Sequence, residues 1–130
     1  MLDLKVLLTK ILDALKADYV IEQGTSGIWT YKKWNSGTCE IWGRWEETLT
    51  NYATWNNMNS YSSSMKQLPF TVYDAVPTYS VKIASGYVFG CSLLHAYANP
   101  LTEVGFYANA SASGSQTVLW ACNIKGKWTQ

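Results

Sequence analysis

A β-hairpin at residues 29–45 constrains the fold most strongly, because its strand register can be read from the sequence. Gly37 follows two polar turn residues, and glycine adopts the left-handed conformation of a three-residue hairpin turn at little cost. With the turn at residues 35–37, Lys32 lies directly opposite Glu40, so that opposite charges meet across the strands. The segment therefore predicts two antiparallel strands in one defined register.

Alternation within this hairpin assigns its side chains to two faces, because successive residues of a strand point in opposite directions. We expect one face to belong to the hydrophobic core. It carries Trp29, Tyr31, Ile41 and Trp45, with Lys33 and Cys39 near the turn. The other face suits a subunit contact or an ordinary amphipathic surface, and it carries Lys32, Trp34, Glu40, Trp42 and Arg44.

The chain from residue 19 onward has the pattern of an antiparallel all-β domain. Short stretches of alternating apolar and polar residues are separated by Gly, Asn, Ser and Pro. We predict an antiparallel β-sandwich at residues 19–130, with residues 109–116 as a hairpin loop. The expected strands are residues 18–23, 27–34, 38–47, 69–74, 78–85, 87–98, 102–110 and 115–128.

Residues 1–18 are predicted to form a short N-terminal α-helix. Its apolar positions, Leu4, Leu8, Ile11 and Leu15, recur at spacings of three and four residues, with Lys and Asp on the other faces. A helix of this length is marginal alone in water. It therefore folds back on its own β-domain or bundles with other copies, and the residue types in the seam favour three or four chains over two. We expect the bundle.

Charge and hydropathy exclude two classes of protein. Charged residues make up 15% of the chain, the net charge is +1, and no run of Lys and Arg occurs, so we expect no binding to nucleic acid. The longest nearly apolar run, residues 87–98, is too short for a membrane helix, and we expect no membrane insertion. The N-terminal segment is interrupted by charges, unlike a secretion signal.

The three cysteines and the single histidine argue against a metal centre. Cys39, Cys91 and Cys122 are far apart and form no CxxC pair, and no Asp-rich calcium loop occurs. We therefore expect no metal and no cofactor. Three buried thiols are the default interpretation, and one disulfide between two of the cysteines stays open.

Catalytic residues are not predicted either. His95 lies among apolar residues, which favours a core or interface histidine over a general base. Hydrolysis of a glycoside needs two carboxylates that face one bond, whereas Glu46 and Glu47 are adjacent on a strand and point to opposite faces. We expect no enzymatic activity.

Residues 51–65 are the candidate binding segment. They show no strand period and are too long for an ordinary connection, which indicates a functional loop. Flat rings and amide groups together suit a neutral sugar or a glycopolymer, and the alternative is a solvated loop with one ring against the sheet. The candidate receptor-binding residues are Tyr52, Trp55, Asn56, Asn57, Asn59 and Tyr61.

The hairpin sequence GIWTYKKWNSGTCEIWG, residues 27–43, resembles an opening hairpin of the C-terminal receptor-binding domains of bacteriophage tail fibres. Residues 68–81 look like the middle strand pair of those domains, and the Trp-rich segment 118–128 is similar to their closing strand. The specific pattern in the hairpin is met by Trp29, Tyr31, Lys33, Trp34, Ser36, Gly37, Glu40, Trp42 and Gly43.

This resemblance implies a trimeric β-sandwich at the tip of a tail fibre or baseplate protein, carried in the virion and made in the cytoplasm of the host bacterium. It implies binding to the host surface, without giving the site, because the hairpin looks structural in that family. The second hypothesis is a structural or assembly module of the phage particle without its own ligand. A free lectin-like protein comes third, and a polysaccharide-degrading enzyme comes last.

Overall fold

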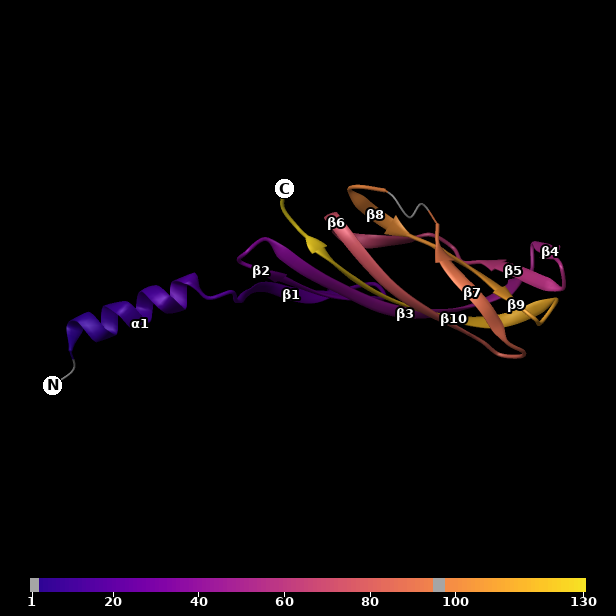
Figure 1. The fold of residues 1–130 in the computed structure, drawn as a ribbon, viewed down its shortest axis with the longest axis horizontal. Coiled ribbons are helices and arrows are strands. Elements are labelled where there is room, and N and C mark those ends of the chain that lie inside the picture. Colours follow the sequence, from indigo (N-terminus) through magenta and orange to yellow (C-terminus); the bar gives the residue numbers. More distant parts are fainter. Residues whose placement is uncertain (1–2, 95–97) are drawn as a thin grey trace.

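The computed structural model describes residues 3–94 and 98–130, apart from the side chain of Leu15, and the prediction for His95 lies outside the described residues. The described residues form one helix and ten strands (Figure 1). The elements are α1 (Leu4–Lys16), β1 (Val20–Ser26), β2 (Trp29–Trp34), β3 (Thr38–Thr50), β4 (Ala53–Trp55), β5 (Met58–Ser62), β6 (Lys66–Ile83), β7 (Val88–Leu93), β8 (Leu101–Val104), β9 (Phe106–Ala110) and β10 (Ser115–Lys127).

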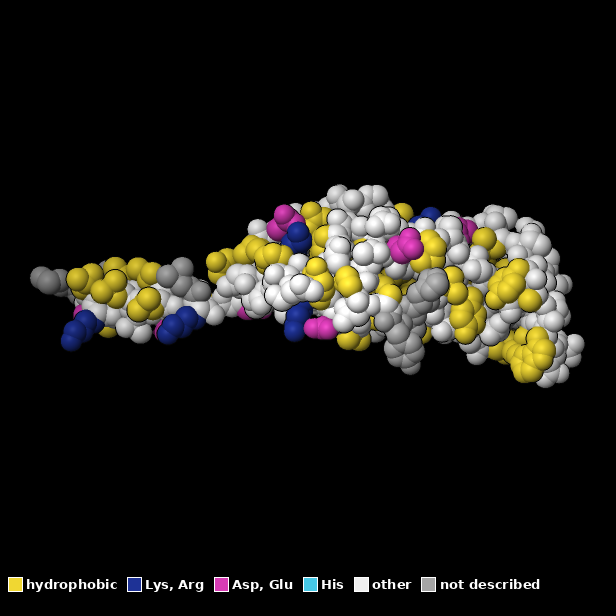
Figure 2. Space-filling model, turned by 90° about the horizontal axis from the view of Figure 1, so that it is seen from above, with side chains coloured by type: hydrophobic (Ala, Val, Ile, Leu, Met, Phe, Trp, Pro, Cys, Tyr) yellow, Lys and Arg dark blue, Asp and Glu magenta, His cyan; other side chains and the backbone are white. Residues whose placement is uncertain are grey.

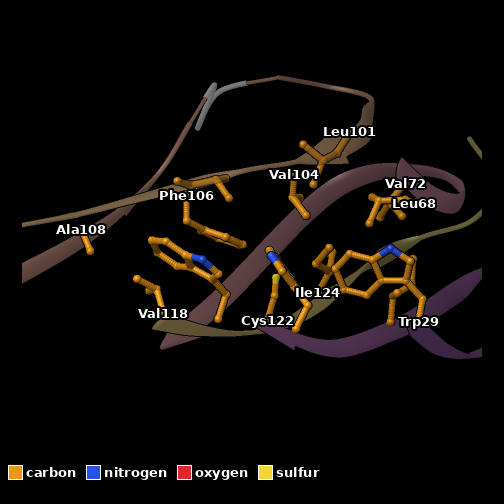
Figure 3. Close-up of a cluster of buried hydrophobic side chains, with 14 of the residues drawn as sticks. Trp29, Leu68, Val72, Leu101, Val104, Phe106, Ala108, Val118, Cys122 and Ile124 are labelled. Atoms are coloured by element: carbon orange, nitrogen blue, oxygen red, sulfur yellow. The ribbon is translucent and has the colours of Figure 1, made fainter. Parts of the chain in front are cut away.

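The strands form two antiparallel sheets. The large sheet has the order β1-β2-β3-β10-β6-β8, and the small sheet has the order β4-β5-β9-β7. Between them lies the core, where Val118 and Cys122 of the large sheet face Phe106 and Ala108 of the small sheet (Figure 3). The expected mainly β fold, with antiparallel sheets after one short N-terminal helix, is confirmed.

The first hairpin has the register that the sequence predicts. Lys32 pairs with Glu40 in the β2–β3 ladder, and Gly37 in the turn has a φ of +93°. Trp29 and Trp45, on the face assigned to the core, are buried, and so is Ile41. The predicted register, and the burial of Trp29, Ile41 and Trp45 on the face assigned to the core, are therefore confirmed.

Trp29 joins three strands of the large sheet. Its ring lies against the backbone of Gly43 on β3, where an added Cβ atom would stand 2.7 Å from ring atom Cε3 and 2.8 Å from a backbone oxygen. Its indole N–H donates to the carbonyl oxygen of Gln67 on β6 at 2.8 Å. The ring also meets Trp45 edge to face, with the centroids 5.9 Å apart. Trp29 thus holds β6 against the first hairpin.

Lys33 fastens the C-terminal end of the chain to this hairpin. Its ammonium group lies 4.4 Å from the ring centroid of Phe70 and 5.6 Å from that of Trp128, which is cation–π geometry. It also pairs with the carboxylate of Glu22 at 2.9 Å. The indole N–H of Trp128 donates to the carbonyl oxygen of Trp34. The Lys-Trp pair of the hairpin motif therefore has a structural role.

Several predicted elements differ in detail from the structure. Residues 102–110, predicted as one strand, are divided between β8 of the large sheet and β9 of the small sheet. The strands predicted at residues 69–74 and 78–85 are joined in one long strand, β6, which ends at Ile83. Asp74 takes a positive φ, and the strand continues through this irregularity without a turn. The hairpin loop predicted at residues 109–116 is not formed, because residues 111–114 connect β9 of the small sheet to β10 of the large one. A Gly- and Ser-rich composition is typical both of a hairpin loop and of a connection between two sheets, so it does not distinguish them. The strands that pair with β10, which are β3 and β6, are far from it in the sequence.

Helix α1 extends away from both sheets (Figure 1), so it does not fold back on its own β-domain. Asp3 caps the helix by accepting a hydrogen bond from the backbone N–H of Lys5. Leu4, Leu8 and Ile11 are 67%, 51% and 47% exposed, so the apolar stripe faces solvent in the single chain. The predicted contribution of Leu15 lies outside the described side chains. Within the described residues, no helix has the length and apolar character needed to cross a membrane.

The contact between Trp29 and Gly43 generates a stability prediction. Gly43→Ala should lower the free energy of unfolding by about 1–3 kcal/mol, because the new methyl group overlaps the indole ring and the backbone. Gly90→Ala is the matched control, since a Cβ atom there meets nothing within 4 Å. Urea unfolding of both variants measures the difference. Equal stabilities would contradict the packing described for Trp29.

Candidate functional site

Residues 51–65 contain a β-hairpin, so the prediction of a loop without strand structure is wrong. Strands β4 and β5 pair with Trp55 opposite Met58, which leaves Asn56 and Asn57 as a two-residue turn. Both asparagines have a positive φ, 49° and 66°, as a type I′ turn requires. Asparagine tolerates this backbone conformation better than most residues, and the polar sequence is explained by the turn.

Four of the six candidate receptor-binding residues are exposed on this hairpin. Trp55 is 72% exposed and Tyr52 is 64% exposed, and the turn residues Asn56 and Asn57 are also exposed. The hairpin lies at the end of the β-domain opposite the helix (Figure 1). Large rings and amide groups are thus brought together on an accessible turn.

The other two candidates, Asn59 and Tyr61, are buried, and their prediction as ligand-contacting residues is corrected. Alternation along β5 turns both side chains toward the large sheet. The hydroxyl group of Tyr61 donates to the carbonyl oxygens of Ala112 and Gly114, at 2.9 and 3.1 Å. Tyr61 therefore supports the connection between β9 and β10 from inside.

Asn59 stands at the centre of a hydrogen-bond network beneath the hairpin. Its side-chain oxygen accepts from the hydroxyl group of Thr54 at 2.8 Å, and its NH2 group donates to the carbonyl oxygen of Ser111. Asn51 extends the network by accepting from the backbone N–H of Gly114 at 2.8 Å. Asn59 is thus a positioning residue that holds the hairpin beside residues 111–114.

Sequence reasoning missed two exposed rings at the same end of the small sheet. Tyr87 is 77% exposed and Phe89 is 59% exposed. Tyr87 lies beside residues 111–114, which connect β9 to β10. The backbone N–H of Ser111 donates to the carbonyl oxygen of Tyr87 at 2.8 Å. Both residues lie at the start of the nearly apolar run 87–98, which the sequence predicts to be a strand. Because almost every residue of this run is apolar, alternation does not show which of its rings point outward.

Tyr52, Trp55, Tyr87 and Phe89 have the largest exposed fractions of the aromatic side chains that the structure describes. We call these four residues the aromatic end. Space-filling Figure 2 shows hydrophobic surface at the end of the molecule opposite the helix. Exposed rings are normally scattered singly on a soluble domain. Their concentration at one end marks this surface as the candidate binding site.

A second candidate region is a shallow hollow of about 560 Å³ on the outer face of the large sheet. Trp42, Asn123 and Thr78 follow one another across β3, β10 and β6 in its floor. Trp42 is half-buried, and Arg44 stands at the rim. The sequence predicts that this face of the hairpin is a subunit contact or an ordinary amphipathic surface, and this stays a prediction.

The chemistry of the cysteines is unsuited to nucleophilic catalysis. All three are free thiols. Burial raises the pKa of Cys39 and of Cys91 to about 11, and burial together with the neighbouring Cys91 raises the pKa of Cys122 to about 12. The thiols are therefore protonated at neutral pH, whereas the thiolate is the reactive form. Among the described residues, no three His, Cys, Asp or Glu side chains gather where they could hold a metal ion.

The buried hydroxyl group of Tyr61 leads to a test of its reassigned role. Tyr61→Phe should lower the free energy of unfolding by about 1 kcal/mol, because the carbonyl groups of Ala112 and Gly114 lose the hydroxyl group that donates to them. Tyr52→Phe, which changes an exposed ring in the same way, should leave stability within about 0.5 kcal/mol. Thermal and urea unfolding measure both effects. A Tyr61→Phe variant as stable as the unmodified protein would contradict this assignment.

Comparison with known proteins adds no relative from which a role could be transferred. No family model, no curated protein and no solved structure matches this chain.

Proposed function

We propose that this chain is the host-recognising tip domain of a bacteriophage tail fibre or baseplate protein. It binds a glycan or a cell-wall polymer of the host surface as a multivalent trimer, without catalysis, and it is carried in the virion. The observation that carries the proposal is the separation of two exposed apolar surfaces: the stripe of α1 at one end and the aromatic end at the other (Figure 1). The resemblance of residues 27–43 to tail-fibre hairpins supports the same function.

The aromatic end offers the chemistry that a saccharide requires. The ring of Trp55 gives a flat apolar face on which the C–H face of a sugar ring can stack, and tryptophan is prominent among residues that dominate binding energy. The amide groups of Asn56 and Asn57 supply both donors and acceptors for sugar hydroxyl groups. The turn and the network around Asn59 hold these groups in place before the ligand arrives, which lowers the entropic cost of binding.

The exposed stripe of α1 supplies the multivalency. Leu8 and Ile11 are about half exposed in the single chain, and burying them against the same residues of two other copies removes apolar surface from water. Three parallel helices would direct three aromatic ends toward one cell surface. Simultaneous attachment can raise the overall affinity by roughly 10² to 10⁴ without any new contact.

The structural alternative, an assembly module of the phage particle without its own ligand, is favoured by the hollow around Trp42. Its mixture of half-buried ring, guanidinium group and hydroxyl groups fits a protein contact. On this alternative the unmodified domain binds neither host cells nor isolated glycans, although it still assembles into particles. Attachment of the isolated domain to host cells separates the two functions.

The first test of the proposal removes the ring of Trp55. Trp55→Ala should weaken attachment to host cells by about tenfold or more, because most binding energy lies in a few central rings. The melting temperature should stay unchanged, because the ring is exposed. Tyr19→Ala is the control, since it removes an exposed ring at the helix end of the β-domain. Attachment of Trp55→Ala at the unmodified level would place recognition elsewhere.

The second test concerns the trimer. Light scattering of the unmodified chain should give about three times 14.6 kDa, and the double variant Leu8→Asp with Ile11→Asp should give a monomer, because charges in the stripe must be desolvated. Thr9→Asp adds a charge on another face of the same helix and should leave the trimer intact. A monomeric unmodified chain at micromolar concentration would contradict the proposed assembly.

A further inference from the structure

We infer that the ligand of the aromatic end is an uncharged saccharide and that it lies across the outer face of the small sheet, from Trp55 on β4 to Phe89 on β7. This inference rests on the proposed function and deepens it, because it names the charge class of the ligand and extends the site beyond the hairpin. It is carried by the distribution of charge, by the strand register and by the exposure of rings at both edges of the sheet.

The small sheet contains no Asp, Glu, Lys or Arg. The strands β4, β5, β7 and β9 lack these residues, and so do the segments 51–52, 56–57, 84–87 and 111–114 around them. All 19 charged residues of the chain lie elsewhere. A phosphate-bearing or uronate-bearing polymer needs Lys or Arg to replace the water around its anionic groups, and an unpaired charge that loses its water costs free energy. An uncharged ligand avoids this cost.

The strand register places polar groups between the two aromatic edges. Ser60 of β5 pairs with Asn109 of β9, which pairs with Gly90 of β7. Ser60 and Asn109 alternate with buried neighbours and therefore face outward, and Gly90 lies on the same face because it pairs with Asn109. The hydroxyl group of Ser60 and the side-chain oxygen of Asn109 are 2.7 Å apart. Hydroxyl and amide groups of this kind match the donors and acceptors of a sugar.

Exposed rings stand on both outer strands of the sheet. Trp55 shares the outward face with its partner Met58 on one edge, and Phe89 and the preceding Tyr87 are exposed at the other edge. Neighbouring strands lie about 4.8 Å apart, so β4 and β7 are separated by about 14 Å. This distance suits an oligosaccharide more than a single sugar ring. A ligand confined to the β4–β5 hairpin would leave Phe89 on β7, and Tyr87 just before it, in water.

The hollow on the large sheet fits an uncharged saccharide less well. Lys32, Glu40 and Arg44 all lie on the outer face of its hairpin, and the carboxylate of Glu40 accepts a hydrogen bond from the side chain of Asn123 at 2.9 Å. Arg44 lines this hollow, whereas Lys32 and Glu40 line the adjoining one, which shares Trp42 and Asn123 with it. A neutral ligand across this face would have to displace water from these charges without pairing them. The small sheet imposes no such cost.

The decisive experiment measures which saccharides the chain of residues 1–130 binds. The probe is an array of neutral oligosaccharides built from glucose, galactose, rhamnose and N-acetylglucosamine, beside anionic ones that carry phosphate, uronate or sialate. We expect binding to neutral members only, and affinity within about twofold between about 50 mM and about 500 mM salt, because screening acts on charge pairs. Preference for an anionic member, or an affinity that falls steeply with salt, would overturn the inference.

A pair of substitutions at Gly90 tests the same point on the protein side. A Cβ atom at this position meets nothing within 4 Å, so the fold has room for a side chain that projects over the outer face. Gly90→Lys and Gly90→Glu should weaken binding of the selected neutral glycan to a similar degree, because both obstruct the face. Stronger binding by Gly90→Lys together with weaker binding by Gly90→Glu would indicate an anionic ligand and overturn the inference.

The extent of the site is tested with Tyr87→Ala and Phe89→Ala. Each should weaken binding of the selected glycan by about fivefold or more, with the melting temperature unchanged. Unaltered binding by both variants, while Trp55→Ala abolishes it, would confine the site to the hairpin and overturn the inference but leave the proposed function intact. Absence of binding to any glycan and to host cells by the unmodified chain would overturn the proposed function itself.

Discussion

The close approach of the Trp29 ring to the backbone of Gly43 is the contact on which the rest of the structure depends. Only a residue without a side chain lets the ring lie against β3, and from there the indole N–H reaches the carbonyl oxygen of Gln67 on β6. Strands β2, β3 and β6 of the large sheet are joined at this point. Lys33 adds to these contacts, because its ammonium group lies over the rings of Phe70 and Trp128 and so holds β6 and the C-terminal segment to the same hairpin.

This construction separates the rings that build the protein from the rings that are free to bind. Trp29, Trp45 and Trp120 are buried in the core, whereas Trp55 is mostly exposed on a two-residue turn. Buried rings stabilise the scaffold through packing, and a scaffold fixed in this way lets an exposed surface vary without loss of the fold. A density of aromatic residues in the sequence therefore does not locate the binding surface. The small sheet, which lacks charged residues and lies far from α1, indicates the position of the binding surface better.

The sequence was most informative where local rules decide the structure. The glycine at the turn and the alternation of side chains gave the register and the faces of the first hairpin, and the apolar spacing gave α1. Other features depend on contacts between distant residues. The position of β10 between β3 and β6 is one, and the burial of Tyr61 under residues 111–114 is another. The strand character of residues 51–65 was missed because an Asn-Asn turn within a polar segment resembles an ordinary loop.

The central claim is that recognition belongs to the aromatic end while the hairpin rings serve the scaffold. Trp55 and the core residues Trp29, Trp45 and Trp120 each contribute an indole N–H signal to a two-dimensional NMR spectrum, and the most direct measurement records these signals while a bound glycan is titrated. We predict that the signal of Trp55 shifts and that those of the three core tryptophans stay in place. Shifts of Trp34 and Trp42 with Trp55 unchanged would contradict the account.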